Sequence, residues 1–394
     1  MTINAAFNSG IINTAVNGAV NYADAQNREK VTFDELDKDI QDIVKQIESY
    51  DIGGGNNPTP DIPTPTTDPT ANWDKTKVDP VESADNVVVP VPKGFVASKA
   101  TGENTVENGF VIYQGTDDVT DSNKDTAMTT RNQFVWVPVA DPSKMFTTHD
   151  GKDVGRLYDF DKTSKTYTEI TWNNRGYREP DVVTGSDGLK YDAGASNYSS
   201  AGITGITNAD EFKTQLETEF AEMKTSIEKY HGFYIGRYET GAVSRAKAVT
   251  VKGNSDIANR TWYKLYQMNK EMINANGIKS SMIWGSQWDQ TMIWFDTQGG
   301  AKKDYVYNST GKGHYSASST TTTGSSTAYA VNNIYDMAGN AWDWTLEANY
   351  TNYRILRGGN YSYSGSDSPA SSRDSDYFPT DSDGSFGSRS TLIM

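Results

Sequence analysis

Two motifs near the C-terminus decide the fold: NIYDMAGNAWDWT at residues 333–345 and RILRGGNY at residues 354–361. The two tryptophans of the first motif alternate as side chains do along one face of a strand, and we expect one of them to anchor the core. Gly339-Asn340 fits a tight turn with positive φ, and the glycine pair of the second motif permits a close approach of the backbone. We therefore predict structural roles for Trp342, Trp344, Arg357, Gly358 and Gly359.

These motifs resemble the DMAGNVWEWT and RVLRGGSW signatures of formylglycine-generating-enzyme-like domains. Phe134–Val139 and Gly232–Glu239 resemble the early strands of that family, and Trp284–Trp294 resembles the segment before its signature. Order and rough spacing agree over about residues 85–394. The resemblance implies an α+β domain with a C-type lectin fold of the formylglycine-generating-enzyme-like subclass.

The resemblance also covers enzymes that oxidise a cysteine. Their chemistry resembles copper-assisted thiol oxidation at paired cysteines. This chain has no cysteine, and its three histidines, His149, His231 and His314, lack the spacing of a metal-binding triad. We therefore expect no catalytic residue, no metal ligand and no cofactor. An oxidase of the formylglycine-generating type is the less favoured alternative.

The composition narrows the choice of partner. The chain has 394 residues, a formal net charge of −15 and a pI of about 4.7. Nucleic acids and anionic membrane surfaces would repel such a chain, so we expect neither as a partner. No stretch approaches the ~18–20 apolar residues of a membrane span, and no signal peptide is visible.

The first 80 residues predict a stalk and a linker. Residues 33–47 carry apolar side chains at three- and four-residue spacings, which predicts an amphipathic helix, either packed on the body or extended as a stalk. Residues 52–72 hold three glycines and five prolines, a composition typical of a linker. We predict a helical stalk at 1–51, a flexible linker at 52–80 and a ligand-binding domain at 81–394.

The first residues, Thr2–Asn13, resemble the segment that follows the membrane helix in type IV pilin-like proteins of Gram-positive bacteria. We expect an apolar helix to precede Met1 in the native protein. The resemblance implies display at the cell surface or in a pilus-like fibre, with pilus or pseudopilus subunits as partners of the N-terminal helix.

The domain itself shows short strand and helix patterns. Strands are predicted at 87–91, 94–96, 109–113, 133–139 and 232–239, and helices at 208–230, 262–276 and 285–296. Residues 141–205 and 298–330 are polar and rich in turn residues, and there we predict loops.

The last segment has an unusual composition, NYSYSGSDSPASSRDSDYFPTDSDGSFGSRS at residues 360–390. A frame of Gly, Pro, Ala, Arg and Phe is visible, and Ser, Asp and Tyr fill the positions between. An Asn codon AAY becomes Ser, Asp or Tyr when one adenine is replaced. Within a variable region at about 357–394, the predicted ligand-binding residues are Tyr361, Ser362, Tyr363, Ser364, Ser366, Asp367, Ser368, Ser372, Asp374, Ser375, Asp376, Tyr377, Asp381, Ser382, Asp383 and Ser385.

This pattern resembles the variable region of proteins that diversity-generating retroelements mutate at template adenines. Those proteins have C-type lectin folds with variable residues near the C-terminus. Tyr offers a rigid contact surface and Ser, Asp and Asn offer adaptable hydrogen bonds, as in antibody loops. Two alternatives remain open: a disordered Ser/Asp-rich tail, and calcium binding by Asp381-Ser382-Asp383-Gly384, which lacks a full calcium loop.

The sequence thus predicts a non-catalytic, surface-displayed binding protein whose ligand is a protein or other cell-surface molecule. A phage or prophage receptor-binding tail protein on the virion is the alternative with the same variable fold.

Overall fold

The computed structural model describes residues 68–394 except 172–176, 181–194, 245–246, 256–257 and 350–352. The chain divides into two units, Met1–Thr66 and Thr67–Met394. The predicted stalk, the pilin-like segment and residues 52–67 of the predicted linker lie outside the described residues. Residues 68–80, also assigned to the linker, belong to the second unit, because Trp73 is buried against Tyr230 with ring centroids 5.9 Å apart.

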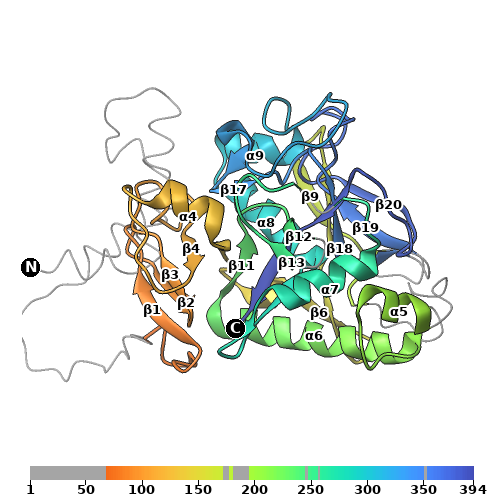
Figure 1. Cartoon of the computed structure of the whole chain (residues 1–394), viewed down its shortest axis with the longest axis horizontal. Helices are drawn as coiled ribbons and strands as arrows, with labels where there is room; N and C mark the ends of the chain where they lie inside the picture. The colour runs from red at the N-terminus through yellow and green to blue at the C-terminus, as the bar shows by residue number, and fades with distance from the viewer. Residues whose placement is uncertain (1–67, 172–176, 181–194, 245–246, 256–257, 350–352) are drawn as a thin grey trace, which may run out of the picture. The chain divides into compact units, whose positions relative to one another are not determined.

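A seven-stranded antiparallel sheet has the order β14-β15-β22-β11-β5-β4-β3. Its strands are β3 (Phe95–Ala97), β4 (Val111–Gln114), β5 (Gln133–Pro138), β11 (Gly232–Gly236), β14 (Asn274–Ala275), β15 (Ile278–Met282) and β22 (Ser390–Ile393). The strands predicted at 94–96, 109–113, 133–139 and 232–239 are confirmed by β3, β4, β5 and β11. Because β22 is the last strand and lies between β15 and β11, the chain's C-terminal residues belong to the core (Figure 1).

A second sheet carries both motifs. Its order is β10-β18-β19-β20, formed by β10 (Tyr177–Arg178), β18 (Trp342–Asn349), β19 (Tyr353–Arg357) and β20 (Arg373–Tyr377). β21 (Phe386–Ser388) pairs in parallel with the first residues of β18. Helix α8 (Gly285–Thr297) contacts β5 of the first sheet and β18 of the second, and therefore joins the two.

The predicted helices are confirmed by α6 (Ala209–Tyr230), α7 (Trp262–Met272) and α8. Asn208 caps α6 by accepting a hydrogen bond from the Glu211 amide at 2.9 Å, and His231 ends the helix in the left-handed conformation. The apolar row of α6, from Phe212 to Ile227, is buried. It packs against β11 and β22 of the first sheet.

The regions predicted as loops contain further elements. They are β6 (Phe146–His149), β7 (Lys152–Gly155), β8 (Tyr158–Asp161), β9 (Thr166–Glu169), α5 (Ala195–Ala201) and α9 (Gly300–Tyr307). The hairpins are four residues a side and mostly polar, so their periodicity is weak. Ring contacts that join distant segments support them, for example Phe160 with Tyr307 at 6.2 Å.

The remaining elements are short. They are β1 (Val78–Glu82), β2 (Val88–Pro92), α4 (Lys124–Thr130), β12 (Gly241–Ser244), β13 (Lys247–Val249), β16 (Ala330–Val331) and β17 (Ile334–Tyr335), with 3-10 turns at Pro142–Lys144 and Thr327–Tyr329. The strand predicted at 87–91 is confirmed by β2. Among the helices of the described ranges, none has the length and apolarity that crossing a membrane would require. The described unit is of the predicted α+β class.

Candidate ligand-binding surface

The glycine positions within each of the two motifs have the backbone geometry that was predicted. Gly339 and Asn340 have φ of 74° and 59°, and Gly358 and Gly359 have φ of 88° and 78°. A Cβ on Gly358 would lie 2.7 Å from the Met337 carbonyl oxygen. Close approach of the backbone therefore requires glycine where the chain leaves β19.

Residues 360–390 are called the C-terminal segment. The two tryptophans of the first motif face this segment from β18. Trp344 is fully buried and lies 5.4 Å from Phe386, measured between ring centroids. Trp342 is 4% exposed and contacts Tyr363 edge-on at 5.9 Å. Trp344 thus packs against the segment inside the core, whereas Trp342 contacts Tyr363, an exposed residue of the segment.

The frame of the C-terminal segment is anchored in the core. Most of its residues are buried, namely Gly365, Pro369, Ala370, Ser371, Pro379, Phe386, Gly387 and Arg389, whereas Arg373 and Thr380 are half-buried. The Ala370 carbonyl accepts from the Trp288 indole at 2.9 Å, and its amide donates to the Ser309 hydroxyl at 2.9 Å. The Ser371 hydroxyl donates to the Val306 carbonyl at 2.6 Å. The segment is therefore a folded part of the domain, which argues against a disordered tail.

The predicted ligand-binding residues occupy the positions between these anchors. All are partly or fully exposed except Ser368 and Ser385, which are 7% exposed each. The Ser368 carbonyl accepts from the Tyr315 hydroxyl at 2.6 Å, and the Ser385 carbonyl accepts from the Trp342 amide at 2.7 Å. Both serines are therefore largely covered by the domain, and Ser368 also lines the cavity beside the β8–β9 hairpin.

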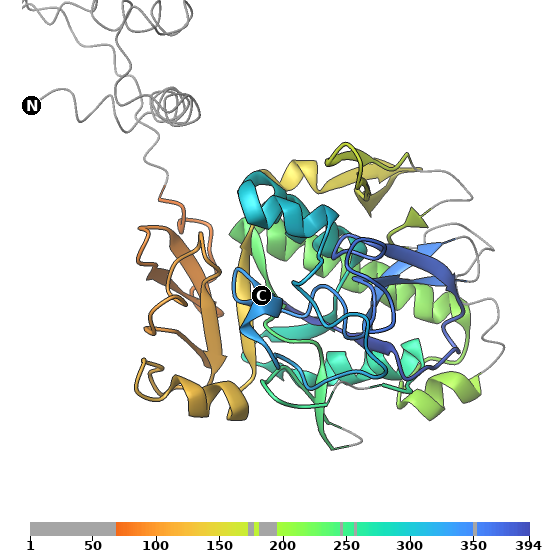
Figure 2. The same ribbon diagram turned by 90° about the horizontal axis from the view of Figure 1, so that it is seen from above.

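Several of the exposed residues lie close enough to interact with one another. β20 pairs with β19, with Asp374 opposite Leu356 and Tyr377 opposite Arg354. Burial raises the pKa of the Tyr377 phenol, and the charges of Asp374, Tyr363, Asp383 and Asp376 raise it further. Tyr363 and Asp383 lie outside β20 and still act on Tyr377 within it, so side chains from three parts of the segment lie near one another. In Figure 1, β19 and β20 lie on the side of the unit away from β1–β3, and Figure 2 shows the same unit from above.

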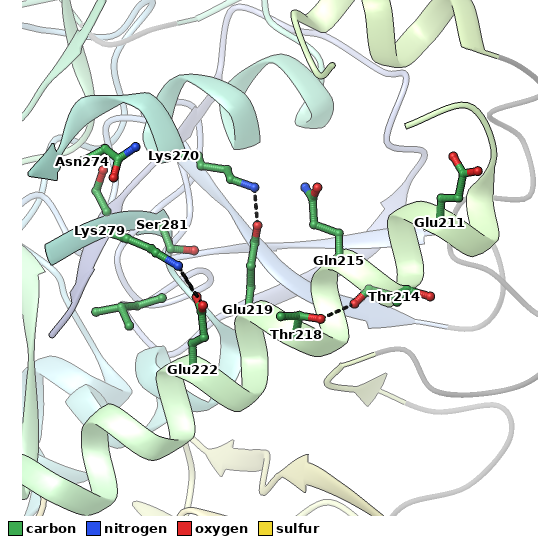
Figure 3. A pocket seen from close by; sticks show the side chains of 12 residues that line it. Glu211, Thr214, Gln215, Thr218, Glu219, Glu222, Lys270, Asn274, Lys279 and Ser281 are labelled. Carbon is green, nitrogen blue, oxygen red and sulfur yellow. Dashed lines mark hydrogen bonds and ion pairs between the residues drawn. The ribbon is translucent and has the colours of Figure 1, made fainter. Parts of the chain in front are cut away.

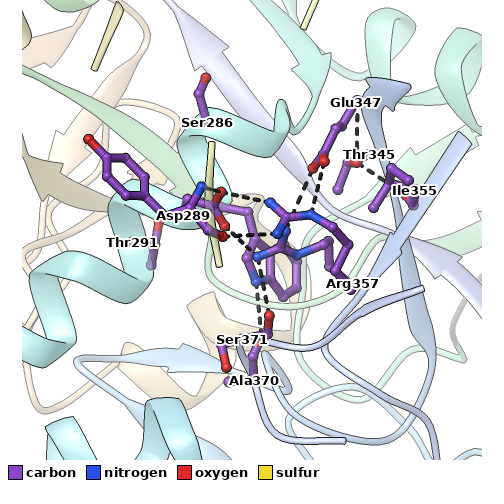
Figure 4. Close-up of polar contacts among 12 residues, drawn as sticks. Ser286, Asp289, Thr291, Thr345, Glu347, Ile355, Arg357, Ala370 and Ser371 are labelled. Carbon is purple, nitrogen blue, oxygen red and sulfur yellow. Dashed lines mark hydrogen bonds and ion pairs between the residues drawn. The ribbon is translucent and has the colours of Figure 1, made fainter. Parts of the chain in front are cut away.

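A buried cluster of charges holds β20 on the domain (Figure 4). Asp289 of α8 pairs with Arg357 of β19 and, at 2.8 Å, with Arg373 of β20. Glu347 of β18 lies 2.9 Å from the Arg373 guanidinium and 3.6 Å from that of Arg357. All four side chains are 7% exposed or less, so two cations and two anions compensate one another inside the protein.

Burial shifts the ionisation of this cluster. It raises the pKa of the Glu347 carboxyl, while the arginine charges act in the opposite direction. It lowers the pKa of Arg357, and the neighbouring Arg373 lowers it further. The sequence motif identified Arg357, whereas Asp289 and Glu347 were missed. The sequence feature that could have identified Asp289 and Glu347 is a carboxylate among tryptophans and other apolar residues, on α8 and β18 respectively.

A cavity of about 530 Å³ opens between the C-terminal segment and the β8–β9 hairpin. The segment contributes Tyr363, Asp367, Ser372 and Asp374, and the hairpin contributes Asp159, Phe160 and Lys162. The Lys162 ammonium donates to the Asp367 carbonyl at 2.8 Å, which ties the hairpin to the segment. The hairpin was predicted as loop, and its place beside the predicted ligand-binding residues was not predicted.

A second cavity, of about 490 Å³, lies among α6, α7 and β15 (Figure 3). Its charges pair with each other: Lys279 with Glu222 at 2.7 Å, and Lys270 with Glu219. The Tyr266 hydroxyl also donates to Glu219, at 2.6 Å. Because the polar groups already have partners, this cavity is a weaker candidate than the first.

The histidines and the Asp-rich turn have local roles. His231 ends α6, His314 contacts the Ser319 carbonyl at 3.0 Å, and His149 lies near Asp150 at 3.3 Å. Asp381 accepts from the Phe378 amide and Asp383 from the Ser385 amide, each at 2.8 Å. In the described part of the chain, no group of three or more His, Cys, Asp or Glu side chains is arranged to hold a metal ion.

No protein-family model matches the chain, and no curated protein matches it. Solved structures show weak similarity. PvdO from Pseudomonas aeruginosa is 14% identical with a TM-score of 0.31 and covers 42% of this chain and 82% of its own. Treponema denticola variable protein 1 is 14% identical, with a TM-score of 0.30 and 41% and 85% coverage. The U1 variant of Major Tropism Determinant is 13% identical, with a TM-score of 0.20 and 74% and 94% coverage. Similarity this low decides neither fold family nor function.

Proposed function

We propose that Thr67–Met394 is a ligand-binding domain with a C-type lectin fold of the formylglycine-generating-enzyme-like subclass. Exposed side chains between Tyr361 and Asp383 contact the ligand, which is a protein or another cell-surface molecule. The domain binds without catalysis and without a cofactor, and nucleic acid is not its partner.

One observation carries this proposal: buried frame residues alternate with exposed Ser, Asp and Tyr along the C-terminal segment. Substitutions at exposed sites typically change stability by about 0.5 kcal/mol or less, whereas changes in a packed frame cost several times more. The segment therefore tolerates variation where a ligand would touch it and resists variation where the domain holds together.

The restricted set of residues supports diversification by a retroelement. Adenine replacement in AAY codons yields Ser, Asp and Tyr, which fill most of the exposed positions. Sequencing the last ~40 codons beside any near-copy in the same genome tests this part. Differences confined to template adenines support it, and differences at other bases argue against it.

Display at the cell surface completes the proposal and rests on the pilin-like N-terminal residues. Pilus or pseudopilus subunits would then be partners of the N-terminal helix. Neighbouring genes separate this role from that of a phage tail protein: pilus genes favour the bacterial surface, and phage structural genes favour the virion.

Two matched libraries test the binding surface. The first varies Tyr363, Ser366, Asp367, Asp376 and Ser382 over Asn, Ser, Asp and Tyr, and the second applies the same changes to Gly365, Ala370, Ser371, Phe386 and Gly387. Both are displayed on yeast, sorted for folded protein and then selected against a panel of purified cell-surface proteins. We expect the first library to stay folded and yield binders, and the second to lose folded protein. Equal folding of both libraries, or no binder from the first, would contradict the proposal.

A further inference from the structure

The cavity beside β20 has two walls of different origin. One wall consists of predicted ligand-binding residues, Tyr363, Asp367 and Asp374, and the other is the β8–β9 hairpin with Asp159 and Phe160. The hairpin lies outside the segment that diversification would change. The cavity has a volume of about 530 Å³, which is within the range of small-molecule sites. A space of this size can hold one side chain of a partner protein.

The charges in the walls favour a cation. Asp159 and Asp367 are exposed, and Asp374 is half-buried. The Arg373 charge is compensated by Asp289 and Glu347. The Lys162 ammonium is bound to main-chain carbonyls and keeps its charge, so the three aspartates still leave the walls with a net negative charge. Burial raises the pKa of Asp374 and the charge of Asp376 acts in the same direction, while a hydrogen bond from the Asp376 backbone amide lowers it. A cation placed in the cavity would relieve this repulsion.

The aromatic groups add a second, independent feature. Trp342 is 4% exposed and lines the cavity, and within the described residues its indole N–H donates to no acceptor. Because this nitrogen is not among the buried unpartnered atoms of the described residues, the N–H reaches solvent, and a ligand acceptor can replace the water there. Tyr363 and Phe160 offer ring surface for an alkyl stem and for a cation–π contact.

A basic residue within a peptide chain satisfies both requirements. Its ammonium or guanidinium group pairs with the aspartates, its methylenes lie on the rings, and its carbonyl oxygen accepts from the indole. We propose that this cavity binds a lysine or arginine residue of a protein partner, with the β8–β9 hairpin as the invariant wall of the site. This inference rests on the proposed function and names the chemistry recognised at one place on that surface.

Four small probes test the inference on the full chain. They are the N-acetyl methylamides of lysine, arginine, norleucine and glutamate, with spermidine as a cation that lacks a carbonyl group. Binding is followed by the indole N–H signal of Trp342 in two-dimensional NMR spectra, assigned with Trp342→Phe. Asp374→Asn and Asp159→Asn each remove one charge from the cavity. Asp117→Asn removes one exposed charge far from it, between β4 and α4, and is the matched control.

We expect the lysine and arginine probes to shift the Trp342 signal, with weaker binding at higher salt. Asp374→Asn and Asp159→Asn should each weaken binding about fivefold, whereas Asp117→Asn should leave it unchanged. Equal binding of the norleucine probe, preference for the glutamate probe, or equal effects of Asp374→Asn and Asp117→Asn would overturn the inference. Saturation by spermidine alone would overturn the peptide ligand in favour of a free polyamine.

The library selection keeps the two proposals distinguishable. If the library yields binders while the cationic probes leave Trp342 unmoved, the inference about the cavity fails and the proposed function stands. If the probes bind but no library member binds any partner, the proposed function fails.

Discussion

The buried charge cluster makes a sharp prediction for Asp289→Asn. This substitution keeps the shape of the side chain and removes its charge. One carboxylate oxygen faces Arg357, and the other accepts from Arg373 and from the Tyr158 amide, each at 2.8 Å. Without that charge, Glu347 alone would face two buried guanidinium groups. The variant therefore buries an uncompensated positive charge.

The expected cost follows from the burial of the cluster. Asp289, Glu347 and Arg357 are fully buried, and the Arg373 side chain is 7% exposed. Removing one member of a buried ion pair typically costs about 3–5 kcal/mol, because the remaining charge stays desolvated. We expect Asp289→Asn to lower the free energy of unfolding by that amount.

Urea unfolding followed by tryptophan fluorescence measures this effect. Asp304→Asn is the control, because its pair with Lys165 is 61% and 48% exposed and should contribute about 1 kcal/mol or less. Asp289→Asn combined with Arg373→Gln restores the charge balance, and we expect the double variant to be less destabilised than the sum of its single changes. A loss below 1 kcal/mol for Asp289→Asn, or strict additivity in the double variant, would refute the compensating role of the cluster.

Three further predictions concern the backbone, the surface and pH. Gly358→Ala should destabilise the domain more than Gly151→Ala in thermal unfolding, because both glycines have positive φ but only the new methyl at 358 would meet a carbonyl, at 2.7 Å; equal losses would contradict this reason. Tyr363→Ser should change the free energy of unfolding by about 0.5 kcal/mol or less, because the side chain is 43% exposed. Ala370→Tyr should prevent folding, because the position is fully buried. Circular dichroism distinguishes the two outcomes. Burial raises the pKa of Glu179 to about 8, so the folded protein holds a proton that the unfolded chain releases near 4.5, and stability should fall as pH rises between these values. Glu179→Gln should remove this part of the pH dependence in urea titrations, and the same change at the half-exposed Glu217 should not. An unchanged slope in Glu179→Gln would count against the assignment.

Much of the fold could be predicted because the signals are local. Phe212, Leu216, Phe220 and Met223 repeat at helical spacing, and the helix they predicted begins and ends within one residue of α6. The Gly339-Asn340 turn follows from the residues that tolerate positive φ. By contrast, apolar and polar residues alternate too weakly in the β8–β9 hairpin to predict its strands. Phe160 is buried through its contact with Tyr307, which is distant in the sequence. The same reason explains why α9, within a stretch of Gly, Ser and Thr, was predicted as loop.

The predicted ligand-binding residues show the same division. Composition marked the C-terminal segment and its frame, since a restricted set of residues is visible in the chain itself. Composition did not distinguish Ser368 and Ser385 from the exposed serines, because burial depends on neighbours that are distant in the sequence. Here these neighbours are Tyr315 and Trp342, which donate hydrogen bonds to the two serine carbonyls.

The sequence by itself determined the two motifs, the main helices and the limited set of side chains available to a ligand. These properties are carried by neighbours within a few positions, through helical spacing, turn conformation and codon chemistry. Only the tertiary structure decided that Asp159 and Asp374 share one cavity and that Asp289 and Glu347 neutralise two arginines. Those groups are far apart in the chain, and the packing of two sheets against α8 brings them within the few ångströms over which charges and contacts act.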